Sequence, residues 1–125
     1  MQLDDDLQAI KQGINGCSLV AFGDLRTRLT LSAVSDRRRS QESLDQICAQ
    51  ASRAFKAVDA LSKVPTFDDR NRNTAMMKMS EELFVFVRSH ENEFDALFCV
   101  CDDASAEQQV SSLARGVFDK LAPVN

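Results

Sequence analysis

Residues 83–101 read LFVFVRSHENEFDALFCVC, and this stretch decides the fold. It contains two apolar segments, residues 83–88 and 96–101, on either side of a polar turn. In the first segment leucine and valine alternate with phenylalanine, so both faces of an extended chain are apolar. Strands with two apolar faces lie at the centre of a sheet that is covered on both sides. We therefore expect two central strands that pair as a hairpin, with helices above and below them.

Three more segments are strand-like. They are residues 74–79 (TAMMKM), which lead into the central pair, and residues 18–24 (SLVAFGD) and 29–35 (LTLSAVS). The last two are separated by four residues, a length that suits a hairpin loop. In the last segment, apolar residues at every second position from Leu29 onward predict that one face of the strand is buried.

Helical periodicity marks the remaining elements. Residues 3–14 carry one apolar stripe behind an acidic first turn, residues 41–62 form the longest element, and residues 105–121 begin with a capping-box spacing. Residues 63–73 are rich in Asp, Arg and Asn, which is typical of a loop. The element order is therefore α-β-β-α-β-β-β-α. It predicts an α+β fold in a single domain, residues 1–125, with a five-stranded antiparallel sheet that helices cover on both faces.

The composition excludes several classes of protein. With 15 lysine and arginine residues against 19 aspartate and glutamate residues, the net charge is −4, which disfavours binding to nucleic acid. The first residues are acidic, so a secretory signal is not expected, and no apolar stretch is long enough to insert into a membrane. We therefore expect a cytoplasmic protein with no nucleic-acid partner and no membrane insertion.

The sequence shows none of the usual signatures of catalysis or cofactor binding. It has no glycine-rich phosphate loop, and its four cysteines include no Cys-x-x-Cys pair. The single histidine, His90, lies in a polar turn, and the cysteines lie in apolar segments that would raise the pKa of a thiol. We expect no catalytic residue, no cofactor and no metal site, and hence no enzyme. The basic run Arg37-Arg38-Arg39 is more typical of a solvated loop than of a binding patch.

The long predicted helix has a second face, opposite its apolar stripe. Ala49, Arg53, Ala57 and Ala60 lie there and form a low surface against which another helix could pack closely. Alanine is also the best helix former on a solvated surface, so the pattern allows either an interface or an ordinary exposed face.

Methionines gather in the strand-like segment 74–79. Met77 and Met79 share one face of the strand, and Met76 lies on the other. They are either ordinary core residues or an adaptable apolar edge that pairs with a second subunit, since an exposed apolar edge would otherwise aggregate.

This order of elements resembles the roadblock family, the small domains related to roadblock-type dynein light chains and to bacterial partners of Ras-like GTPases. The resemblance covers nearly the whole chain, from the helix at Leu3 to the helix that ends at Leu121, and it rests on pattern because the family has no catalytic signature. Family members often have a glycine in the first hairpin turn, whereas this chain has the turn Asp24-Leu25-Arg26-Thr27-Arg28.

The resemblance implies a profilin- or longin-like fold and a homodimer. In such a dimer the long helices pack against each other, and the strands that begin the second half pair across the two-fold axis. Carried over to this chain, the resemblance assigns the dimer interface to Ala49, Arg53, Ala57, Ala60, Met76, Met77 and Met79.

The function that the resemblance implies is that of a non-enzymatic scaffold or regulator in a bacterial cytoplasm. Its partners would be a second copy and a small Ras-like GTPase, or a motor or signalling complex. Some relatives stimulate GTP hydrolysis by positioning the GTPase's own residues. The alternative is a type III secretion chaperone, which is also small, acidic, dimeric and α/β, and which would bind an unfolded effector segment along apolar grooves. An isolated ligand-sensing domain would need an interior cavity.

Overall fold

The computed structural model describes residues 2–65, 72–102 and 107–121. The elements follow the predicted order, and their ends lie within a residue or two of the predicted positions. The predicted start of the last helix at residue 105 and residues 66–71 of the predicted loop lie outside the described residues. The elements are α1 (Gln2–Gly13), β1 (Cys17–Asp24), β2 (Leu29–Ser35), α2 (Gln41–Leu61), β3 (Thr74–Met79), β4 (Glu82–Arg88), β5 (Asp95–Cys101) and α3 (Glu107–Leu121).

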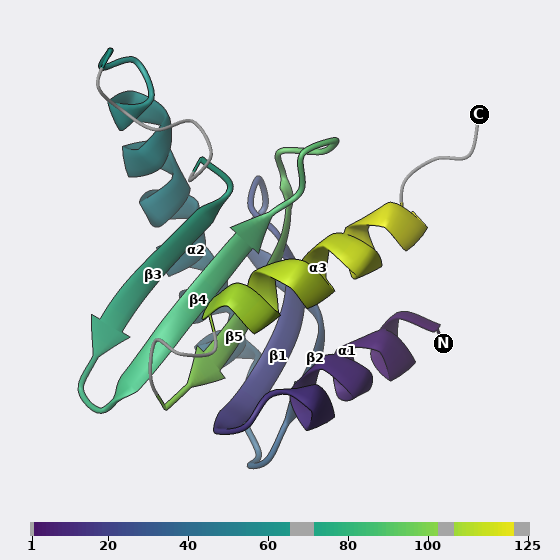
Figure 1. Ribbon diagram of the computed structural model, residues 1–125. Helices are drawn as coiled ribbons and strands as arrows, with labels where there is room; N and C mark the ends of the chain where they lie inside the picture. The colour runs from purple at the N-terminus through teal and green to yellow at the C-terminus, as the bar shows by residue number, and fades with distance from the viewer. Residues whose placement is uncertain (1, 66–71, 103–106, 122–125) are drawn as a thin grey trace.

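The five strands form one antiparallel sheet in the order β2-β1-β5-β4-β3 (Figure 1). β5 lies between β1 and β4, and β4 lies between β5 and β3. The prediction that these two apolar strands are central is therefore confirmed. In β4, Leu83, Val85 and Val87 face one side of the sheet, and Phe84 and Phe86 face the other. β2 and β3 are the two edge strands of the sheet.

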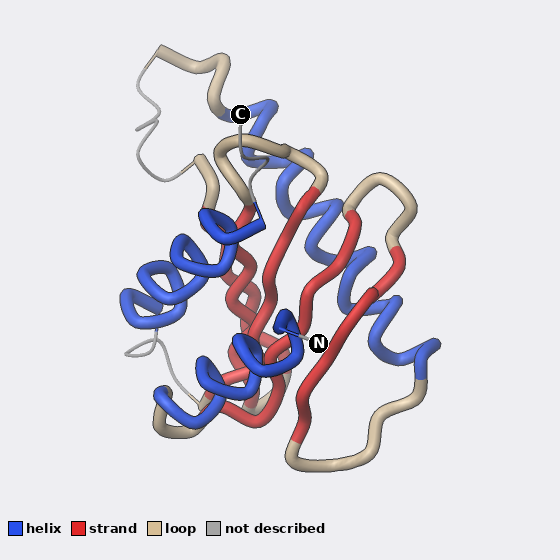
Figure 2. Tube along the Cα trace, turned by 90° about the vertical axis from the view of Figure 1, so that its right-hand side faces the viewer, coloured by secondary structure: helices blue, strands red, loops and turns tan. Residues whose placement is uncertain are grey.

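An apolar layer lies on each face of the sheet. α1 and α3 lie side by side over one face, and α2 covers the other (Figure 2). α2 is anchored by the stripe that its periodicity predicted, and each large side chain that it buries contributes about 1.5–3 kcal/mol. Its buried apolar residues are Leu44, Ile47, Cys48, Ala51 and Phe55.

Edge strand β2 differs from the prediction. Leu29 is 48% exposed and Leu31 is 61% exposed, whereas Thr30 between them is buried. α2 holds Thr30, because the backbone N–H of Thr30 donates a hydrogen bond of 2.7 Å to Oδ1 of Asp45. The expectation that alternation buries one apolar face of this strand is therefore wrong: α2 reaches β2 at Thr30 and leaves the two leucines outside its cover.

Within the described ranges, two turns place a residue other than glycine in the left-handed region. These residues are Arg28, with φ of 62°, before β2, and Ser80, with φ of 55°, between β3 and β4. The N–H of Arg28 donates a 2.7 Å hydrogen bond to the carbonyl of Asp24 and closes the first turn. The turn thus forms without the glycine that roadblock domains often have there, at a strain of about 1 kcal/mol.

Candidate protein-interaction face

β3 is an open edge of the sheet, since within the described residues it pairs only with β4. The N–H of Arg88 donates to the carbonyl of Asn73 over 2.8 Å, which marks these two residues as a hydrogen-bonded pair. Such pairs alternate along an antiparallel ladder, so the backbone groups of Thr74, Met76 and Lys78 point away from β4. An edge of this kind can pair with a strand of another chain.

The three methionines of β3 differ in burial. Met77 lies opposite Phe84, is half-buried and packs against the apolar layer under α2. Met76 lies opposite Val85 on the other face of the sheet and is 51% exposed, and Met79 is also exposed. One methionine therefore joins the core, and two leave apolar surface at the open edge.

The outer face of α2 carries the other residues that the sequence singled out. Arg53, Ala57 and Ala60 are exposed, and Ala49 is half-buried. Because three of these four side chains are alanine, the helix backbone is accessible to a partner at close range. We call this surface, together with the edge of β3, the α2–β3 face.

Two exposed apolar residues at the end of α2 were missed by the sequence analysis. Leu61 is the last residue of the helix, and Val64 follows it in the adjoining turn. Leu61 lies one helical turn after Ala57, so its spacing of four residues was a signal that could have found it. These two residues extend the apolar part of the α2–β3 face.

A buried cation ties the last turns of α2 to the end of β4. Arg88 is only 5% exposed, and its guanidinium donates to both carboxylate oxygens of Asp59, at 2.8 and 3.0 Å. It also lies 4.5 Å from the ring centroid of Phe55 and donates to the carbonyl of Arg72 and to Oδ1 of Asn73. The hydrogen bonds from Arg88 hold the pKa of Asp59 below its ordinary value. Because the guanidinium of Arg88 makes all of these contacts within the fold, we assign this cluster a structural role.

A groove of about 380 Å³ opens beside this cluster, between α2 and the tips of two hairpins. Phe55 and Phe94 line it, together with three cations, Arg26, Arg28 and Lys56, and two carboxylates, Asp59 and Glu93. The guanidinium of Arg26 lies 5.1 Å from the ring centroid of Phe94. The groove therefore offers apolar side chains and charges of both signs to a bound partner. It was not foreseen because its lining comes from three separate parts of the sequence.

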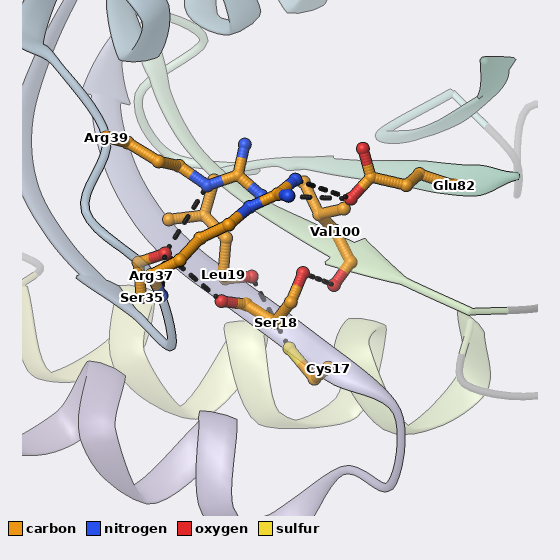
Figure 3. A network of polar contacts seen from close by, with 8 residues as sticks. All are labelled: Cys17, Ser18, Leu19, Ser35, Arg37, Arg39, Glu82 and Val100. Carbon is orange, nitrogen blue, oxygen red and sulfur yellow. Dashed lines mark hydrogen bonds and ion pairs between the residues drawn. The ribbon is translucent and has the colours of Figure 1, made fainter. Parts of the chain in front are cut away.

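At the opposite end of the sheet, the loop before α2 is fastened to the start of β4 (Figure 3). Arg37 and Arg39 reach Oε2 of Glu82 at 3.4 and 3.7 Å, and Nε of Arg39 donates to the hydroxyl of Ser35. The Arg39 side chain is only 10% exposed, and burial lowers its pKa. The prediction of a solvated loop is therefore wrong for Arg39, although Arg37 is exposed.

Two negative findings concern the described part of the chain. No group of histidine, cysteine, aspartate or glutamate residues there is arranged to hold a metal ion. Among the helices in the same residue ranges, none is both long enough and apolar enough to cross a membrane.

The architecture recurs in solved structures. A Roadblock/LC7 domain from Streptomyces avermitilis aligns with a TM-score of 0.72 and 15% sequence identity, over 94% of this chain and 96% of that one. This chain has the roadblock fold. Myxococcus xanthus MglB aligns with a TM-score of 0.69 and 9% identity, over 96% of this chain and 97% of that one.

A third structural neighbour of this chain is described as MglB with a tetrameric arrangement. It aligns with a TM-score of 0.72 and 14% identity, over 97% of this chain and 85% of that one. The sequence itself matches no protein-family model and no curated protein. The roadblock fold is therefore established through the structure, by the layering of α2 on one face and α1 and α3 on the other.

Proposed function

We propose that this roadblock domain is a dimeric, non-catalytic scaffold or regulator that binds a small Ras-like GTPase. The fold supports this proposal, and so does the tetrameric arrangement described for one neighbour of the same fold. The dimer forms through the α2–β3 face. Its contact residues are Ala49, Arg53, Ala57, Ala60, Met76, Met77 and Met79, with Leu61 beside them.

The open edge of β3 is the observation that carries the proposal. A second copy of β3, placed antiparallel across a two-fold axis, satisfies the outward backbone groups of both strands at once. Met76 then lies near the axis in each copy. Because Met76 is 51% exposed in one chain, covering both copies contributes about 2 kcal/mol before any helix contact is counted.

The α2 helices of two such chains come together beside the extended sheet. Helices approach to about 8–10 Å when the residues between them are small, and the exposed alanines meet this requirement. A glutamate at the centre of that contact would place a large charged side chain between two closely packed helices, which is strongly unfavourable.

The dimer is tested with the variant Ala57→Glu and size-exclusion chromatography with light scattering. Ala57 is exposed in the single chain, so the variant is expected to fold and to have the mass of a monomer, while the unmodified chain has the mass of a dimer. Leu31→Glu is the matched control, since Leu31 is an exposed apolar residue at the other sheet edge and should leave the dimer intact. A dimer mass for Ala57→Glu would contradict the proposed contact.

The GTPase is tested by capture from lysate of the source cells, in parallel with GDP and with a non-hydrolysable GTP analogue. We expect mass spectrometry to find one small GTPase enriched in one nucleotide state, because a regulator must distinguish the two states. A secreted effector captured equally in both conditions would contradict the GTPase assignment and favour the chaperone.

A further inference from the structure

Three of the four cysteines lie close together on the side of the sheet that α1 and α3 cover. Cys17 begins β1, and Cys99 and Cys101 lie at the end of β5, the neighbouring strand. Cys17 is directly opposite Cys101 in the antiparallel register, whereas Cys99 is opposite Val20. Cys48 lies on the other face, among the residues under α2.

The register gives Cys17 and Cys101 the spacing of a disulfide. The N–H of Asp102 donates to the carbonyl of Gly16 over 3.1 Å, one residue outside the pair. This bond marks Cys17 and Cys101 as a non-hydrogen-bonded pair, the type whose Cα atoms are about 4.5 Å apart. Disulfides form when the Cα atoms are about 4.4–6.8 Å apart and the side chains point the same way. The register predicts the first, beside a bulge that follows Cys17 in β1, and the second agrees with the place of both side chains in the same apolar layer.

The surroundings distinguish Cys17 from the other two thiols. It is 7% exposed, and Cys99 and Cys101 are less so. Its sulfur lies 3.4 Å from the carbonyl of Leu19, at the end of β1 that Figure 3 shows. Hydrogen bonds from Cys101 and then from Cys99 lower the pKa of Cys17, and burial opposes them, so the expectation of a raised thiol pKa in an apolar segment is wrong for this cysteine. Cys17 is therefore the thiol best placed to react first.

We propose that Cys17 and Cys101 form a thiol-oxidation site, which a peroxide converts into an intramolecular disulfide. The sulfur of Cys17 attacks one oxygen of hydrogen peroxide, so an S–O bond forms, the O–O bond breaks and water leaves. The sulfur of Cys101 then attacks Cys17, an S–S bond forms, the S–O bond breaks and a second water leaves. The two thiols lose two electrons and two protons, and the peroxide is reduced to two molecules of water.

Cys99 does not complete this reaction, although it also contacts Cys17. It sits two residues along β5 from Cys101 and lies opposite Val20, so it is a diagonal neighbour of Cys17 and not its partner in the register. Hydrogen bonding to Cys17 and burial raise the pKa of Cys99 well above its ordinary value, which keeps it a thiol. Cys48 is separated from all three by the sheet itself.

The experiment exposes the reduced, folded chain to hydrogen peroxide, then denatures it, alkylates the remaining thiols and measures the intact mass. We expect the number of alkylated thiols to fall from four to two, and a reductant added before alkylation to restore all four. A digest of the oxidised chain should contain one cross-linked peptide pair, which joins Cys17 to Cys101. This peptide map needs no variant, so it does not depend on whether a substitution disturbs folding.

Single variants provide the matched controls. Cys17→Ala should retain all three of its remaining thiols after peroxide, whereas Cys101→Ala should lose one, because the sulfenic acid formed on Cys17 has no thiol to displace it. Cys48→Ala and Cys99→Ala should each lose two. Circular dichroism confirms that each variant is folded. Retention of all four thiols in the unmodified chain, a bridge from Cys17 to Cys99, or a bridge between two chains would each overturn the proposal.

Discussion

Arg28 shows how one backbone angle affects the stability of a hairpin. It occupies the left-handed region, with φ of 62°, where a side chain is strained and glycine is not. We predict that Arg28→Gly raises the free energy of unfolding by about 0.5–1 kcal/mol, because relief of strain exceeds the added entropy of the unfolded chain. Urea unfolding followed by circular dichroism measures this change. Arg26→Gly, in the same turn but without a positive φ, should lower the free energy of unfolding instead.

The ion pair of Asp59 with Arg88 predicts how stability depends on pH. Replacing Asp59 by Asn leaves the buried guanidinium without its anion, and we expect a loss of about 1–2 kcal/mol at pH 7, since Asp59 itself is partly exposed. The pKa of Asp59 is lowered in the folded state, so its stabilisation is complete above the unfolded pKa of about 3.9 and is lost as the pH falls through the lower folded pKa.

Urea unfolding of both proteins across a pH series tests this dependence. The difference in unfolding free energy between the unmodified chain and Asp59→Asn should be constant near neutrality and shrink below about pH 4, where protonated Asp resembles Asn. A difference that stays the same down to the lowest pH would show that the charge of Asp59 plays no part in it.

At the scale of elements, the sequence predicted best where burial is complete. β4 is apolar at every position but its ends, so it can only be a central strand, and the structure confirms this. β2 was harder, because alternation shows that a strand has two different faces but not which face a helix covers. Thr30 is the buried residue there, and its hydrogen bonds to α2 reach residues 14 and 15 positions later in the chain.

The stability of α2 depends on the capping of its first turn as well as on its buried apolar stripe. The hydroxyl of Ser40 accepts a hydrogen bond of 3.1 Å from the N–H of Ser43 and caps the helix. We predict that Ser40→Ala lowers the free energy of unfolding by about 1 kcal/mol, because it leaves that N–H without its partner. Ser40→Asp keeps an acceptor oxygen, so its free energy of unfolding should stay within a few tenths of a kcal/mol of the unmodified value. Thermal melts of both variants followed by circular dichroism measure these changes. Equal losses in both variants would show that the cap contributes nothing.

The candidate sites differ in how visible they were in the sequence. The α2–β3 face was predictable in outline, since Ala57 and Met76 lie within single elements whose periodicity can be read directly. The pairing of Cys17 with Cys101 was not, because it depends on the register between two strands that are distant in sequence. The bidentate contact of Arg88 with Asp59 was not predictable either, because it joins a strand to a helix residue 29 positions earlier in the chain.

At the scale of the whole molecule, a dimer built on the α2–β3 face would make the stability of the folded chain depend on protein concentration. If a folded dimer unfolds to two separate chains, a tenfold rise in concentration adds about 1.4 kcal/mol to the free energy of unfolding of the dimer. For a chain of this size, this raises the melting temperature by roughly 2–4 °C. We therefore predict that the melting temperature of the unmodified chain rises with concentration by this amount, as scanning calorimetry can measure. Leu31→Glu should keep the same dependence, whereas Ala57→Glu should melt at one temperature throughout. A constant melting temperature for the unmodified chain over a hundredfold range would mean that the α2–β3 face adds nothing to the stability of the fold, and the exposed methionines of β3 would then need another partner to cover them.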